Sequence, residues 1–180
     1  NFPIKSSETA YLFLQHFIKK LKMGGRSGII IKNTFLNNRD AKNLRKQLLE
    51  ECNLHTILDL PAKVFTAGVK TVVLFFEKGK PTKDIWFYQL NLERSLGKTN
   101  ALNQNDLEEF CNLYEKRSNS ENSWKIDISK IDKVDWDLTP INPNKKETVD
   151  QRSPEELLEE IQKIDNQTAD IIENIKKELS

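Results

Sequence analysis

Apolar positions in the first 92 residues alternate between helical stripes and short extended runs. Spacing of 3.6 residues predicts a helix between Ser6 and Gly24, with a stripe of Leu12, Phe13, Phe17, Ile18 and Leu21. A second helix is expected over residues 38–52. Runs rich in β-branched and aromatic residues predict strands at 28–31, 54–60, 71–76 and 85–90. This order of elements indicates an α/β fold.

Two of the strand segments carry information about sheet topology. The run at 28–31 is apolar without alternation, which is typical of a strand covered on both faces, as in a parallel sheet. Residues 61–70 leave no room for a helical crossover between the second and third strands. We therefore expect these two strands to be antiparallel neighbours.

The pattern changes beyond residue 92. Residues 93–105 read as a loop, 106–114 as a short helix, and a segment rich in Pro and Asn begins near Asp135. A last helix is expected from Pro154, which follows Ser153. Its apolar residues repeat at alternating spacings of four and three, a seam that favours a partner helix. The predicted regions are therefore 1–92, 93–150 and 151–180.

Composition and charge exclude few classes of protein. Net charge is +1, so no global basic signature marks a nucleic-acid binder. Residues 145–180 carry six basic and ten acidic side chains, which leaves about +5 on the remainder, a bias that suits a polyanion. Cys52 and Cys111 form no CxxC pattern, and no apolar stretch is long enough for a bilayer. A reduced, cytoplasmic chain without a membrane partner is expected.

Familiar catalytic motifs do not occur in this sequence. His16 and His55 have no second ligand at metal spacing, so packed or surface histidines are expected. The glycine-rich stretch at 24–28 follows a helix and precedes a strand, which is the reverse of a phosphate-binding loop. We interpret it as a helix stop and a tight turn.

The loop after the second predicted strand is the most informative stretch. It places Phe65 between Lys63 and Lys70. Phe65 tucked into the core is one interpretation. The other is a base-binding loop, in which the aromatic ring stacks on a base and the cations meet phosphates. The residues alone leave both open.

An ordered series of short blocks resembles the adenine-N6 DNA methyltransferases. The blocks include Gly-Gly-Arg-Ser-Gly at 24–28, Asn-Thr-Phe-Leu at 33–36, residues 44–49 and 60–71, and Phe-Phe-Glu-Lys at 75–78. Gly-Lys-Thr-Asn at 97–100, residues 106–110 and Asp-Trp-Asp-Leu at 135–138 resemble one branch, the modification subunit of type I restriction–modification systems. The resemblance covers nearly the whole chain.

The resemblance implies the C-terminal half of a class I, Rossmann-like methyltransferase sheet, ending in an antiparallel hairpin and followed by a C-terminal helical extension. The donor would be S-adenosylmethionine, whose binding loop and whose Asn-Pro-Pro-aromatic catalytic motif have no match here. Phe65 matches the aromatic residue that stacks on the flipped-out adenine, while Lys63 and Lys70 are candidate phosphate contacts. Asn33 falls where the family has Pro-Asn, but Lys32 replaces the proline.

Partners are implied in the same way: DNA, a specificity subunit and a restriction subunit. The specificity subunit would contact the seam of Leu157, Ile161, Ile164, Ile171 and Ile175. As a fragment, the chain is expected to be inactive alone and to self-associate through an exposed strand edge or the unpaired seam. One alternative is a stand-alone interaction module. Another is an adenine methyltransferase of a different restriction system, fused to its own recognition domain.

Overall fold

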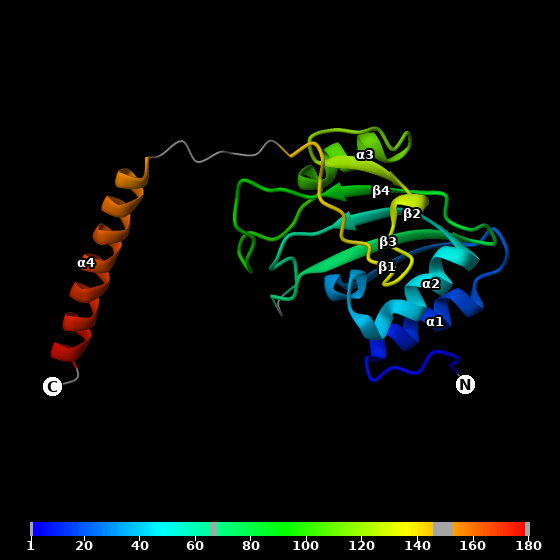
Figure 1. Ribbon diagram of the computed structural model, residues 1–180, viewed down its shortest axis with the longest axis horizontal. Coiled ribbons are helices and arrows are strands. Elements are labelled where there is room, and N and C mark those ends of the chain that lie inside the picture. The colour runs from blue at the N-terminus through cyan, green and yellow to red at the C-terminus, as the bar shows by residue number, and fades with distance from the viewer. Residues whose placement is uncertain (1, 66–67, 146–152, 179–180) are drawn as a thin grey trace. The chain divides into compact units, whose positions relative to one another are not determined.

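The computed structural model describes residues 2–65, 68–145 and 153–178. The chain divides into two compact units, Asn1–Lys145 and Lys146–Ser180. The first unit contains a sheet with its helices, and the second contains one long helix (Figure 1).

The sheet of the first unit has five strands in the order β1-β3-β2-β4-β5. They are β1 (Arg26–Lys32), β2 (Cys52–Asp59), β3 (Thr71–Lys78), β4 (Asp84–Gln89) and β5 (Ser123–Asp127). Strand β3 is antiparallel to both β1 and β2, whereas β2 and β4 are parallel. Strands β1, β2 and β4 therefore point the same way. The predicted α/β class and the antiparallel β2–β3 pair are confirmed.

Helices cover both faces of this sheet. Helices α1 (Thr9–Lys20) and α2 (Lys42–Glu51) lie on one face, and α3 (Glu108–Tyr114) lies on the other (Figure 1). Strand β3 serves both cores, because Leu74 and Phe76 face α1 and α2 while Phe75 packs on the α3 side. Four short 3-10 turns complete the unit: Asn33–Leu36, Arg39–Ala41, Asn105–Leu107 and Ile128–Lys130.

A bulge in β2 keeps its side chains in these two cores. The pairing with β3 shifts between Leu54 and Thr56. Leu54 and Ile57 consequently both face α1 and α2, although strict alternation would put them on opposite faces. Leu58 then faces α3.

The stripe predicted for the first helix is only partly right. Ile18 is buried, but Phe13 is 58% exposed and Phe17 is also exposed. The buried face instead includes Gln15, whose carboxamide accepts from the Ile4 N–H (3.1 Å) and donates to the Ile4 carbonyl (2.8 Å). A buried glutamine with both groups paired is stable there, and a pattern based on apolar residues cannot detect it.

The prediction that the strand at 28–31 is covered on both faces is wrong for the described chain. Strand β1 lies at the sheet edge and pairs with β3 in antiparallel register. Ile31 is buried beneath the helices, whereas Ile30 is 53% exposed. Helix α3 packs against β2, β3 and β4 residues, so it does not shelter the outer face of β1.

Arg45 of α2 ties a distant segment to the sheet unit. Its guanidinium is fully buried and donates to the carbonyls of Phe35 and Asn38 (both 2.7 Å). It also donates to the carbonyls of Trp136 (2.7 Å) and Asp135 (2.8 Å). Burial lowers the pKa of Arg45, and nearby acidic groups oppose that shift. Residues 135–138 are thereby fixed against α2.

The second unit contains α4 (Pro154–Glu178), which begins at the predicted proline. Ile161, Ile164, Ile171 and Ile175 are exposed on it, and Leu157 is half-buried. Thr168 lies between Ile164 and Ile171 at the same spacing of four and three, and its hydroxyl donates to the Ile164 carbonyl at 2.8 Å.

Candidate nucleic-acid interface

The carboxyl ends of the co-directional strands bring several chain segments to one edge of the sheet. Asn33 follows β1, and the loop at 60–70 follows β2. In open α/β sheets, ligands bind in the crevice outside the carboxyl ends of the strands. The DNA-contact candidates predicted from sequence, Asn33, Lys63, Phe65 and Lys70, all belong to segments that begin or end at this edge.

Asn33 and Lys70 lie together in a first hollow of about 350 Å³, which we call the Asn33 hollow. The backbone N–H of Asn33 donates to the Lys70 carbonyl at 3.1 Å. Asp59, at the end of β2, lines the same hollow and accepts a hydrogen bond from Lys70 Nζ at 2.8 Å. The segment fixed by Arg45 supplies another wall through Leu138.

Lys70 is therefore already engaged by a carboxylate. Burial raises the pKa of Asp59, while the hydrogen bond and charge of Lys70 oppose that rise. The second oxygen, Asp59 Oδ1, is buried and has no partner among the described residues. The Asp59 carboxylate offsets the positive charge that Lys70 would offer to a phosphate.

Phe65 and Lys63 line a second hollow of about 530 Å³, which we call the Phe65 hollow. Phe65 is 41% exposed and belongs to neither core cluster, so the interpretation that it is tucked into the core is wrong. Its neighbour Val64 packs instead against the α3-side core. Lys63 has a left-handed backbone with φ of 68°, which is uncommon for a side chain other than glycine.

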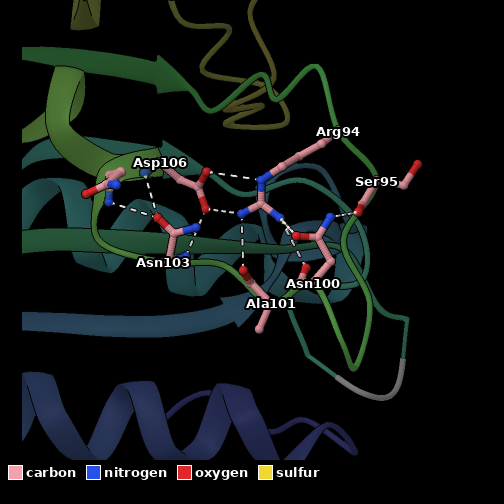
Figure 2. A network of polar contacts seen from close by, with 7 residues as sticks. Arg94, Ser95, Asn100, Ala101, Asn103 and Asp106 are labelled. Atoms are coloured by element: carbon pink, nitrogen blue, oxygen red, sulfur yellow. Dashed lines mark hydrogen bonds and ion pairs between the residues drawn. The ribbon is translucent and has the colours of Figure 1, made fainter.

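The opposite wall of the Phe65 hollow is the turn at 97–101, which contributes Gly97, Lys98 and Ala101. The Arg94 side chain hydrogen-bonds to the backbone of this turn (Figure 2). Its guanidinium donates to the carbonyls of Asn100 (3.2 Å) and Ala101 (3.1 Å), and it pairs with the Asp106 carboxylate. Gly97 and Asn100 also exchange two backbone hydrogen bonds of 3.2 Å.

Asp106 anchors the far side of this network. It accepts from the backbone N–H of Asn103 at 2.8 Å, and this bond is the main reason that the pKa of Asp106 is lowered. Arg94 lowers that pKa further. Asp106 is therefore ionised at neutral pH, and the Arg94–Asp106 pair holds residues 94–106 as one ordered turn.

Sequence reasoning missed Asp59, Arg94 and Lys98 as members of this edge. Lys98 lies in a block that carries the family resemblance, at 97–100, and Asp59 directly precedes another, at 60–71. That signal could have drawn attention to them. Nothing in the sequence could show that Arg94 reaches Asp106 across the loop.

Other chemistry is sparse in the described part of the chain. It contains no cluster of His, Cys, Asp and Glu suited to a metal ion. His55 is half-buried, and burial is the first cause that lowers its pKa to about 4. Burial likewise raises the pKa of the Cys52 thiol to about 11. None of the described helices is long and apolar enough to cross a membrane.

Comparison with known proteins decides the family. A model of the N-6 DNA methylases matches residues 2–152. The chain belongs to the N-6 DNA methylase family. The resemblance found in the sequence is thereby confirmed.

Curated relatives of this N-6 DNA methylase chain are type I methylase subunits. It is 34% identical to the EcoEI methylase subunit of Escherichia coli, an alignment that covers 96% of this chain and 39% of the relative. It is 36% identical to the EcoKI methylase subunit of Escherichia coli K12, over 61% of this chain and 23% of the relative. The chain thus spans well under half the length of these subunits.

Solved structures agree. A modification subunit assigned to a type I restriction enzyme of Vibrio vulnificus YJ016 superimposes with a TM-score of 0.72 at 31% identity, over 78% of this chain and 33% of that one. A chain from a type I R-M system, solved to explain complex assembly and conformational transition, gives 0.72 at 33% identity, over 99% and 41%. The methyltransferase-like fold class predicted from sequence is confirmed.

Proposed function

We propose that this chain forms the target-base side of an adenine-N6 DNA methyltransferase subunit of a type I restriction–modification system. One observation carries the proposal. In a chain of the N-6 DNA methylase family, Phe65 is an exposed aromatic residue in a hollow at the carboxyl edge of the sheet.

The chemistry of the reaction explains the need for such a residue. An enzyme that modifies a base must take it out of the duplex stack, which costs a few kcal/mol. Stacking on an aromatic side chain returns roughly 1–3 kcal/mol per base. Phe65 would hold the extruded adenine, Lys63 would contact the backbone, and Asn33 would offer a polar group to DNA from the other hollow at the same edge of the sheet. Lys70 is the weaker candidate because Asp59 already binds it.

S-adenosylmethionine is the cofactor that this proposal requires, and it supplies the transferred methyl group. The glycine-rich turn in the described chain does not fit it. Gly24 N–H donates to the Lys78 carbonyl (2.8 Å), and the Gly25 carbonyl accepts from Lys78 N–H (2.9 Å). These groups are used by β3 and cannot cradle a ligand. We expect the 180-residue chain to transfer no methyl group alone.

Subunit contacts form the second part of the proposal. The exposed isoleucines of α4 repeat at coiled-coil spacing, and in water they favour a partner helix. We assign that partner to the specificity subunit, with the restriction subunit joining the same complex in the cytoplasm. Without partners, the β1 edge and the α4 seam would promote self-association of the isolated chain.

The exposed α4 seam also supports a second candidate function, a stand-alone interaction module. A reading frame that begins near Asn1 would favour the module. A frame that continues upstream through a donor loop and an Asn-Pro-Pro-aromatic motif would eliminate it. A methyltransferase of another restriction system, fused to its own recognition domain, would show that domain in the same frame.

Turnover of the complete subunit, assembled with its partners, tests the role of Phe65. Phe65→Ala should slow methyl transfer at saturating DNA by roughly 5- to 150-fold, the equivalent of one lost stack. Phe65→Trp should retain most of the activity. Placing the target adenine in a mismatch should restore part of the loss, because a mispaired base is easier to extrude. Unchanged turnover in Phe65→Ala would refute the stacking role.

A further inference from the structure

The two walls of the Phe65 hollow come from two segments that are far apart in sequence. One wall is the loop after β2, and the other is the turn at 97–101. The hollow, at about 530 Å³, falls in the size range of small-ligand pockets. Only one of the walls, the one with Phe65, was expected to meet a nucleotide.

The charge in this hollow is of one sign. Lys63 and Lys98 contribute the charged side chains, one from each wall, and no carboxylate lines the hollow among the residues described. Both lysines are exposed, and neither forms an ion pair within the described ranges. Two free cations beside an exposed aromatic ring match the chemistry of a nucleotide, whose base stacks while its phosphates meet lysines.

The turn that carries Lys98 is ordered by its own contacts. Arg94 fixes the carbonyls on the C-terminal side of Lys98, and Asn100 Nδ2 donates to the Ser95 carbonyl at 2.9 Å (Figure 2). A ligand that binds a preorganised loop loses less conformational entropy than one that must order it. On the other wall, the left-handed backbone of Lys63 is a strained conformation of the kind that accumulates at binding sites.

We propose that Lys98, together with Lys63, binds backbone phosphates of the DNA strand that carries the target adenine. The Arg94 network is the positioning device that holds Lys98 opposite Phe65. This inference rests on the proposed function of Phe65, and it adds a second wall to that site. Lys63 and Lys98 would bind phosphates on both sides of the extruded nucleotide, while the Phe65 ring stacks on its base.

Salt dependence of DNA binding tests the inference in the complete subunit assembled with its partners. The probe is a duplex carrying the sequence that the assembly methylates, titrated by fluorescence anisotropy over a range of NaCl concentrations. Lys98→Gln should reduce the slope of log K against log salt by about 0.9, the value for one lost phosphate contact. Lys98→Arg should keep the wild-type slope, because it keeps the charge.

Lys20→Gln is the matched control. It removes the same charge from an exposed lysine at the end of α1, in the chain segment that leads into the opposite end of β1. Its slope should equal that of the wild type. If the slope of Lys98→Gln also equals the wild type, the inference is overturned.

A comparison of Phe65→Ala with Lys98→Gln separates this inference from the proposed function. A mismatched target adenine should rescue Phe65→Ala but should not restore the slope of Lys98→Gln. If Phe65→Ala has normal turnover while Lys98→Gln loses slope, the stacking role fails and the phosphate contact stands. If Phe65→Ala behaves as expected and Lys98→Gln does not, only the phosphate contact fails.

Discussion

The two hollows at the carboxyl edge of the sheet differ in whether a carboxylate pairs with the lysine predicted to contact DNA. In the Asn33 hollow, Lys70 is bound to Asp59 Oδ2 at 2.8 Å, and the other oxygen of that carboxylate is buried with no partner among the described residues. In the Phe65 hollow, Lys63 and Lys98 form no ion pair with any residue that the structure describes. Lys63 and Lys70 belong to the same loop, seven residues apart, but only Lys63 has a side chain that is not already paired with a described carboxylate.

The difference lies in what supports each wall. The Asn33 hollow is closed by a segment that Arg45 fixes from within the core. The Phe65 hollow is closed by a turn that Arg94 fixes near the surface. Both arginines are structural supports, but Arg45 is fully buried whereas the Arg94 side chain is 30% exposed.

Arg45→Met should produce the largest effect and should damage only the first hollow. Four carbonyls would lose Arg45 as a donor, although that of Asn38 would keep a backbone donor, the Ala41 N–H at 3.1 Å. Each buried group left unpaired costs about 1–3 kcal/mol. After relaxation we expect a loss of at least about 3 kcal/mol in the free energy of unfolding, measured in urea. Hydrogen exchange should accelerate at residues 132–138 and stay unchanged at 94–106.

Lys46→Met is the control for that variant, because Lys46 is a neighbouring exposed residue that pairs with Glu50 on the helix surface. It should cost under about 1 kcal/mol. A loss in Arg45→Met no larger than in Lys46→Met would contradict the role given to Arg45.

Asp59→Asn should give the Asn33 hollow a lysine without a carboxylate partner, as in the Phe65 hollow. The substitution removes a carboxylate whose pKa is raised by burial, and it weakens the contact with Lys70 because an ion pair becomes a hydrogen bond to a neutral amide. In the assembled enzyme, a freed Lys70 that reaches a phosphate would steepen the slope of log K against log salt by about 0.9. The double variant Asp59→Asn/Lys70→Gln should return to the wild-type slope. An unaltered slope in the single variant would mean that Lys70 is out of reach of DNA.

Much of the fold could be predicted from the sequence, because the strands and α2 carry strong apolar patterns. The errors arose where polar groups are satisfied by tertiary contacts, as with Gln15, or where a strand lies at an edge, as with β1. The candidate site was only half predictable. Phe65 stands out in a loop between lysines, but the pairing of Lys70 with Asp59 and the support of Lys98 by Arg94 depend on three-dimensional proximity.

His55 offers a smaller effect that is independent of both hollows. Its pKa is lowered to about 4, whereas an unfolded histidine titrates near 6.5. The unfolded state therefore binds the proton first, and stability falls as the pH decreases from about 6.5 toward 4. His55→Gln should show a shallower loss between pH 7 and pH 5 in urea denaturation. An identical pH dependence in the two proteins would show that His55 does not titrate in this way.

The central claim, that Phe65 meets the target base, can be tested by photocrosslinking. A duplex with 5-iodouracil in place of the target adenine would be irradiated with the assembled enzyme, digested with trypsin and analysed by mass spectrometry. If Phe65 stacks on the target base, a crosslink should form in the peptide Val-Phe-Thr-Ala-Gly-Val-Lys at 64–70 and be located on Phe65. A crosslink that maps reproducibly to another peptide, with none on this one, would contradict the account.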